Sequence, residues 1–146
     1  MEKISQVKND TLQVKYNGKQ IKINLTDELS INESLLNSQL RESPSNYAFL
    51  CTLKDKAIRK RDKLEREKDR IFSELWLFFK NSNSKLSNEY ATHQANQNKK
   101  FKAAEDRYLR AAYEASRLIS ICRAYESRES VLRSLNANIR LEKQPL

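Results

Sequence analysis

The chain has 146 residues, of which 38% are apolar and 32% charged, and its 28 lysines and arginines outnumber its 19 aspartates and glutamates. That length suits one domain or the protomer of an assembly, and so lean a composition is typical of long helices that bury surface against partner subunits. The single glycine excludes a glycine-rich phosphate loop, and no apolar run reaches the roughly 18 residues that a membrane span needs.

The excess positive charge is confined to two stretches. Basic and acidic residues balance over 1–44 and over 81–98, whereas 45–80 holds ten basic and six acidic residues and 99–146 holds eleven and six. A field of this sign favours nucleic acid or another anionic surface as a partner. Because the opening residues lack the apolar segment of a signal peptide, we expect a cytoplasmic protein with no membrane partner.

Residues 11–26 predict a β-hairpin. Asn17-Gly18 is a preferred two-residue hairpin turn. The register that it sets places apolar side chains on one face, in the facing pairs Val14–Ile21 and Leu12–Ile23. An isolated two-stranded hairpin is marginal in water, so this face must dock on helices, or the strand edges must pair with neighbouring subunits.

Two helices are predicted next. Ser30 followed by Glu33 is a capping-box pattern, which predicts a short helix that ends before Pro44. A long helix capped by Ser45 follows over about 46–80, with the apolar stripe Tyr47, Leu50, Leu53, Ala57, Leu64, Ile71, Leu75 and Phe78. Aromatic side chains cover most of the surface at its end, and we expect them to be buried: Phe72, Trp76, Phe78 and Phe79.

The polar stretch 81–98 predicts a loop and then a short helix over about 88–95, capped by Ser87. A second long helix is predicted over about 98–141, because apolar residues recur there at the three-four spacing of a coiled coil. Its seam is Phe101, Ala104, Tyr108, Ala111, Ala115, Leu118, Cys122, Tyr125, Glu129, Leu132, Asn136 and Ile139.

Together these elements predict a mainly α protein. Its main feature is an antiparallel, coiled-coil-like hairpin of two long helices, to which short helices and an N-terminal β-hairpin are added. We divide the chain into 1–44, with the β-hairpin and a short helix, and 45–146, with the long helical hairpin and the polar linker 81–98.

A basic stripe marks the first long helix. Cations recur there three and four residues apart and so share one helix face, at Lys56, Arg59, Lys63, Arg66 and Arg70, with Lys60 beside them. Such a stripe binds a phosphate backbone without sequence preference and with strong sensitivity to salt. The alternative is a solvated charged helix with i,i+4 ion pairs such as Asp62–Arg66.

Two other groups of lysines are weaker candidates. One surrounds Phe101 and consists of Lys99, Lys100 and Lys102. Aromatic residues near cations suit single strands, whose exposed bases can stack, but Phe101 also begins the seam and is better explained as core. Tyr90 and Tyr113 lie off the seam and are freer to stack. The hairpin adds a patch at Lys15, Lys19 and Lys22. Without a base-reading motif, any nucleic-acid binding should be nonspecific.

No residues point to catalysis. Cys51 and Cys122 lie on apolar helix faces, and we expect reduced core residues rather than a disulfide or metal ligands. His93, the one histidine, lies in a polar stretch and is expected to be exposed. No carboxylate pair is placed for acid–base chemistry. We therefore interpret the chain as a non-enzyme that uses no cofactor or metal.

The C-terminal half, AAEDRYLRAAYEASRLISICRAYESRESVLRSLNANIRLE, resembles the closing helix of the UvsY-like recombination mediator proteins of tailed phages. In those chains an alanine-rich helix runs into A-x-E-x-R-x-x-x-L-x-x-L-x-A-x-I/L-R, matched here by Ala124, Glu126, Arg128, Leu132, Leu135, Ala137, Ile139 and Arg140. The upstream layout also agrees, with Pro44 before Tyr47-Ala48, a charged helix, an aromatic end and a polar linker. The resemblance covers about 30–141 and leaves the β-hairpin outside.

The resemblance implies a homo-oligomeric ring that binds single-stranded DNA and helps to load a RecA-like recombinase onto strands coated by single-strand binding protein, in the host cytoplasm if phage-encoded. The basic stripe would line the DNA-binding surface. One rival is a prefoldin-like scaffold or assembly chaperone that needs its charge for solubility and partner helices. Another is a helical inhibitor that mimics or blocks a host DNA-binding protein, although a positive surface argues against mimicry.

Overall fold

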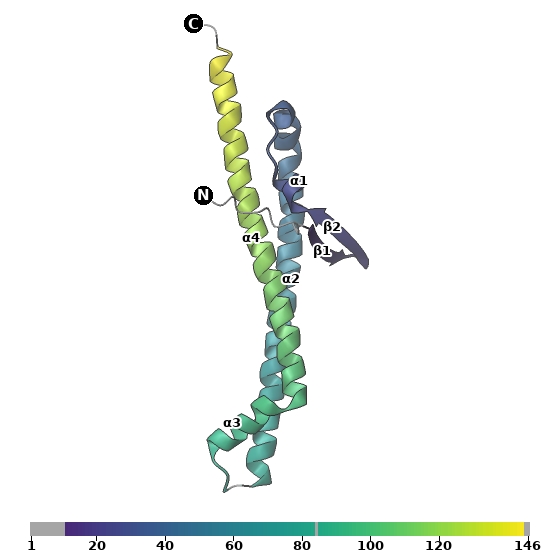
Figure 1. The fold of residues 1–146 in the computed structure, drawn as a ribbon, viewed down its shortest axis with the longest axis vertical. Helices are drawn as coiled ribbons and strands as arrows, with labels where there is room; N and C mark the ends of the chain where they lie inside the picture. The colour runs from purple at the N-terminus through teal and green to yellow at the C-terminus, as the bar shows by residue number, and fades with distance from the viewer. Residues whose placement is uncertain (1–10, 84, 145–146) are drawn as a thin grey trace, which may run out of the picture. The chain divides into compact units, whose positions relative to one another are not determined.

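The computed structural model of the protein describes residues 11–83 and 85–144 (Figure 1). The ten opening residues, considered above for a signal peptide, lie outside these ranges. The elements in chain order are β1 (Thr11–Tyr16), β2 (Lys19–Asn24), α1 (Leu25–Leu29), a 3-10 turn (Glu33–Leu35), α2 (Leu36–Ser82), α3 (Asn88–Gln97) and α4 (Lys99–Glu142). The long helices α2 and α4 pack against each other, which confirms the predicted fold class.

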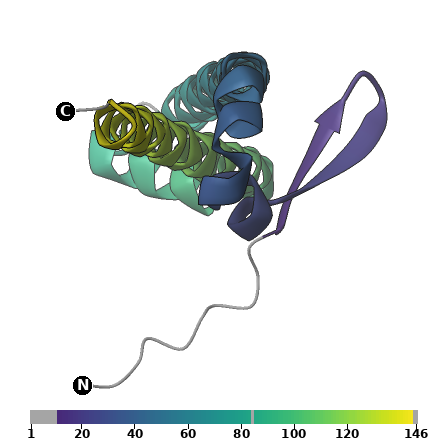
Figure 2. The same ribbon diagram turned by 90° about the horizontal axis from the view of Figure 1, so that it is seen from above.

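The chain divides into two compact units. The terminal unit consists of Met1–Leu53 and Ser120–Leu146, and the central unit consists of Lys54–Ile119. Both long helices contribute residues to each unit. Within each unit, an α2 segment lies beside an α4 segment that runs in the opposite direction, as two perpendicular views show (Figure 1, Figure 2).

The β-hairpin has the predicted turn and register. Asn17 and Gly18 both adopt positive φ, at 49° and 77°, which a two-residue hairpin turn requires of its central residues. The facing pairs are Val14–Ile21 and Leu12–Ile23. Leu12 and Val14 are buried, and Tyr16 meets Phe49 of α2 edge-on with ring centroids 5.3 Å apart. The hairpin therefore docks its apolar face within the terminal unit.

The positions at which helices begin after the hairpin differ from the prediction. Ser30 caps no helix N-terminus; it ends α1, and its hydroxyl donates to the carbonyl of Asp27. The N-cap is Asn32, whose side-chain oxygen accepts from the backbone N–H of Ser34 at 3.0 Å. Asparagine caps as well as serine does, so the capping-box pattern competed with an equally good cap two residues later.

We had predicted that one helix ends before Pro44 and that Ser45 caps the next, and both predictions were wrong. Both residues lie inside α2, which starts at Leu36. A proline in a helix interior removes one backbone hydrogen bond and costs about 3 kcal/mol. The helix continues because it is anchored on both sides of the proline, by the buried side chains of Leu36, Ser43 and Leu50.

The terminal unit is held by contacts along the α2–α4 seam. Tyr47 and Tyr125 stack with ring centroids 6.0 Å apart, and Tyr125 is almost fully buried. Ser43, also buried, donates its hydroxyl to a carboxylate oxygen of Glu129 at 2.9 Å. Glu129 is one of the polar seam positions predicted from sequence, so it forms a specific contact between the helices.

The central unit has an alanine-rich core. The side chains of Ala104, Ala111 and Ala115 are buried along α4, as the predicted seam requires. Phe101 is buried and meets Phe72 of α2 edge-on, with centroids 5.5 Å apart. Ser87 caps α3 as predicted, and its hydroxyl oxygen accepts from the N–H of Tyr90. None of the helices in the described ranges is both long and apolar enough to cross a bilayer.

The aromatic end of α2 is only partly buried, so this prediction was wrong in part. Phe72, Trp76 and Phe79 are half-buried, whereas Phe78 is 66% exposed and Leu77 is 53% exposed. Phe72 packs on α4, and the indole N–H of Trp76 donates to the Thr92 hydroxyl of α3 at 3.2 Å. A helix touched by neighbours on one side leaves the remaining side chains in solvent.

Candidate nucleic-acid interface

The basic stripe of α2 is exposed along its whole length. All six predicted residues have exposed side chains and belong to the central unit: Lys56, Arg59, Lys60, Lys63, Arg66 and Arg70. At a rise of about 1.5 Å per residue, the helix advances about 21 Å between Lys56 and Arg70. A row of charges therefore faces solvent at intervals of one helical turn.

The cations of the stripe differ in how far carboxylates neutralise them. Arg70 is paired with Glu74 at 2.9 Å, and Lys60 with Glu114 of α4 at 3.8 Å. Within the described part of the chain, Arg59, Lys63 and Arg66 have no ion-pair or hydrogen-bond partner. Their charge is available to an external anion.

The ion pair Asp62–Arg66, expected of a solvated charged helix, is not formed. Asp62 instead accepts from its neighbour Arg61 at 2.7 Å, and this contact raises the pKa of the Arg61 guanidinium. Arg61 is half-buried and turned about 160° from Arg59 around the helix axis. The acidic residue therefore neutralises a cation outside the stripe and leaves Arg66 unpaired.

Two ion pairs between helices show which edge of α4 adjoins the stripe. Lys60 meets Glu114, and Glu67 meets Arg107 at 3.3 Å. Arg107 and Glu114 are seven residues apart, so they lie on the same edge of α4, together with Lys100 one heptad earlier. We define the cationic face as the basic stripe of α2 with three residues from this edge: Lys100, Arg107 and Arg110.

Arg107 and Arg110 were missed in the sequence analysis. Both are exposed, and Arg110 lies three residues after Arg107 on the edge that reaches Glu114. The sequence signal was the spacing of four residues, which places their side chains along one edge of the helix: Lys100, Arg107, Arg110 and Glu114. It could be used only once the edge of α4 that adjoins the stripe was known.

The lysine cluster at the start of α4 is divided between two sides of the helix. Lys99, Lys100 and Lys102 are all exposed. Lys102 is about 200° around the helix from Lys100, so it lies off the cationic face, and its ammonium donates to Gln97 at 3.0 Å. Phe101 is buried as predicted and cannot stack with a base in this arrangement.

The hairpin patch is exposed but belongs to the other unit. All three of its lysines belong to the terminal unit: Lys15 and Lys22 lie on the solvent side of β1 and β2, whereas Lys19 follows the turn and pairs with Tyr16 on the other face. The central unit carries 17 of the 28 basic residues and ten of the 19 acidic residues, a net charge of +7 out of +9 for the chain. Most of the net positive charge is thus gathered in the unit that contains the cationic face.

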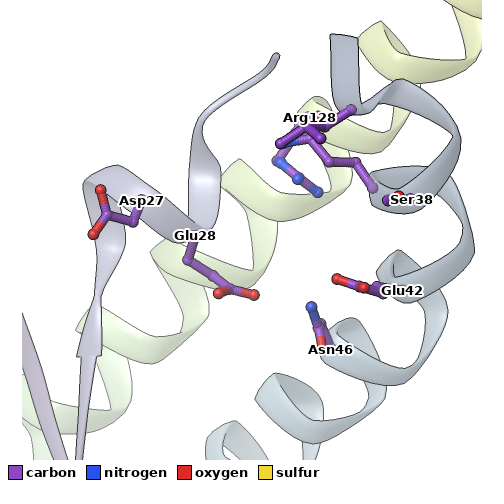
Figure 3. A pocket seen from close by; sticks show the side chains of 8 residues that line it. Asp27, Glu28, Ser38, Glu42, Asn46 and Arg128 are labelled. Carbon is purple, nitrogen blue, oxygen red and sulfur yellow. The ribbon is translucent and has the colours of Figure 1, made fainter. Parts of the chain in front are cut away.

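A pocket of about 280 Å³ in the terminal unit has the opposite character (Figure 3). The carboxylates of Glu28 and Glu42 point toward one another across it, and Asp27 also lines it. Arg128 is only 8% exposed; its Nε donates to the Ser30 carbonyl at 3.2 Å, and its guanidinium lies 5.2 Å from the centre of the Tyr125 ring. Three carboxylates around one cation repel phosphate, so this pocket is no candidate for a nucleic-acid backbone.

Residues that could hold a metal do not gather in the described ranges, where no group of three or more histidine, cysteine or acidic side chains has the required arrangement. His93 is exposed as predicted. Cys122 is buried and Cys51 half-buried, and the two form no disulfide with each other.

Fold and surface together describe a helical-hairpin protein with one strongly cationic unit. Comparisons with protein-family models, curated proteins and solved structures gave no match. The functional argument therefore rests on the geometry and charge of the chain itself.

Proposed function

We propose that the protein is a recombination mediator that binds single-stranded DNA nonspecifically through the cationic face. The observation that carries this proposal is the row formed by Arg59, Lys63 and Arg66, which are exposed and have no partner among the described residues. Cations left without carboxylates gain most from an external polyanion, because binding releases the counterions condensed on its phosphates.

The form of the face suits a continuous phosphate backbone better than a small anion. The charges form a line about 21 Å long on a rigid helix. Lys100, Arg107 and Arg110 widen this line on the α4 side. Such a surface holds successive phosphates without reading bases, which agrees with the expectation of nonspecific binding.

The remainder of the proposal follows from the resemblance to UvsY-like mediators. The protein would act as a homo-oligomeric ring and help to load a RecA-like recombinase onto strands coated by single-strand binding protein, without catalysing a reaction. Exposed apolar side chains are available for contacts between subunits on both units, among them Leu109 and Tyr113 in the central unit and Val131 and Leu141 in the terminal unit.

Charge reversal tests the interface. We expect the triple variant Arg59→Glu, Lys63→Glu and Arg66→Glu to lose single-strand affinity, measured by fluorescence anisotropy in a salt titration. The slope of log K against log salt should fall by about 0.7 for each phosphate contact removed. The matched control reverses Lys15, Lys22 and Lys102, which are exposed and lie off the cationic face, so that net charge changes equally.

Two results would contradict the proposal. One is equal affinity of the two triple variants, which would show that net charge and not the face binds DNA. The other is no binding by the folded wild-type protein at physiological salt, which would favour a scaffold or assembly chaperone. The mediator role itself is measured by strand exchange on DNA coated with single-strand binding protein, with and without the protein.

A further inference from the structure

We propose that Leu77 and Phe78 extend the cationic face with a site for unpaired bases, so that the protein distinguishes single strands from duplexes. This inference rests on the proposed function, because it assumes that the cationic face holds the phosphates of the same strand. It concerns a different part of the ligand, namely the faces of its bases.

The position of Leu77 connects the two surfaces. Lys56, Lys63, Arg70 and Leu77 recur at intervals of seven residues, so they follow one another along the same side of α2. Leu77 is 53% exposed, and its neighbour Phe78 is 66% exposed. A strand held along the basic stripe would meet an apolar surface where the charges end.

Phe78 is held in a way that suits stacking. Its ring meets that of Phe79 edge-on, with centroids 5.4 Å apart, and Phe79 is half-buried. The contact restricts the exposed ring, so less conformational freedom is lost when a base covers it. An aromatic face beside a cationic row is the combination by which proteins bind single strands without sequence preference.

The contacts that join this end of α2 to its neighbours are made by side chains other than Leu77 and Phe78. Phe72 packs on Phe101, and Trp76 is hydrogen-bonded to Thr92, so α2 is joined to its neighbours by other residues. Two large apolar side chains in solvent at the end of a charged row are therefore available to a ligand. In a duplex the base faces are stacked on each other and cannot reach them.

The test compares two strands of equal length, an oligothymidylate and an abasic strand with the same number of phosphates. We expect wild-type protein to bind the oligothymidylate more tightly. Phe78→Ala should weaken that binding by about fivefold to hundredfold and leave abasic-strand binding unchanged, whereas Phe78→Trp should preserve the preference. Tyr90→Ala is the matched control, since Tyr90 is 43% exposed in the same unit but belongs to α3, which contributes no residue to the cationic face.

Trp76, the only tryptophan, lies two residues from Phe78, so its fluorescence provides a second measurement of base binding. Its fluorescence should change when oligothymidylate binds and not when the abasic strand binds. Equal wild-type affinity for the two strands, or equal affinity of Phe78→Ala and wild type for oligothymidylate, would overturn the inference while leaving the proposed phosphate contacts intact. Failure of wild-type protein to bind either strand would instead overturn the proposed function.

A third outcome would assign the surface to another occupant. If Phe78→Ala altered the sedimentation coefficient and weakened binding to both strands equally, Leu77 and Phe78 would contact a second copy of the chain and not bases. Circular dichroism of each variant verifies that the helices are intact, and binding of the abasic strand shows that the cationic face still functions.

Discussion

Ser43 and Tyr47 lie one turn apart on α2, and each donates a hydroxyl hydrogen bond to a glutamate of α4. Ser43 reaches Glu129 and is 2% exposed, whereas Tyr47 reaches Glu126 near the surface. Such bonds are directional, and they fix which residues face one another more strictly than apolar contacts do.

Replacement of Ser43 by alanine removes the buried hydroxyl donor, so the Glu129 carboxylate loses one hydrogen bond. We expect the free energy of unfolding to fall by about 1–2 kcal/mol, measured by urea denaturation. Ser45→Ala is the control, because that hydroxyl is exposed and donates to a carbonyl of its own helix. A loss of similar size in both variants would indicate a general effect of serine replacement in α2 rather than of the bond to Glu129.

The phenol of Tyr47 gives the terminal unit a dependence on alkaline pH. Its hydrogen bond to Glu126 raises the pKa of Tyr47 well above the ordinary value of 10.0, with a smaller contribution from Cys51. The unfolded chain therefore loses this proton first, so the stabilisation is complete below about pH 10 and is lost as pH rises through the folded-state pKa. We expect the stability difference between wild type and Tyr47→Phe to shrink between pH 9 and pH 11 in urea denaturation, and a constant difference would contradict this.

The seam residues of α4 were predictable from spacing alone. Phe101, Leu118 and Leu132 are buried where the three-four repeat placed them. The partners of the polar seam positions were not predictable. That Glu129 accepts from Ser43 depends on the alignment of two helices over 86 residues of separation, which no local pattern contains.

Among the elements, α2 differs most from its prediction. The sequence analysis placed a helix end at Pro44 because proline has no backbone N–H to donate within a helix. The rule describes a cost and not a prohibition, and tertiary contacts on both sides of Pro44 outweigh it. The hairpin and α3 were predicted correctly because their signals, Asn17-Gly18 and Ser87, act within a few residues.

Replacement of Pro44 by alanine should therefore stabilise the protein. The backbone N–H of residue 44 would become available to the carbonyl of Leu40, and the gain should be about 1–2 kcal/mol after the greater freedom of the unfolded chain is subtracted. Urea denaturation measures it, with an unchanged m-value as the sign of an unchanged fold. A loss of stability would show that the packing around Ser43 requires the proline geometry.

At the scale of the whole molecule, charge is distributed unevenly between the units. The central unit has a net charge of +7, and the terminal unit supplies the remaining +2. The basic stripe itself was readable from the sequence, since its residues share one helix. The sequence could not show which cations of α4 join the stripe, or that Leu77 and Phe78 are exposed. Both facts depend on which side of α2 is covered by α4 and which side of α4 is covered by α2.

The antiparallel arrangement also bears on the order in which the chain folds. The contacts of the central unit join residues separated by 16 positions, as in Trp76–Thr92, or by 40, as in Glu67–Arg107. In the terminal unit, the hydrogen bonds that join α4 to the N-terminal part of the chain span 79 to 98 positions, as in Tyr47–Glu126 and Ser30–Arg128. Because the entropy of closing a loop grows with its length, pairing is favoured first beside the polar linker and then spreads toward the chain ends. Each closed turn shortens the loop that the next one must close, so the two helices would join in the manner of a zipper.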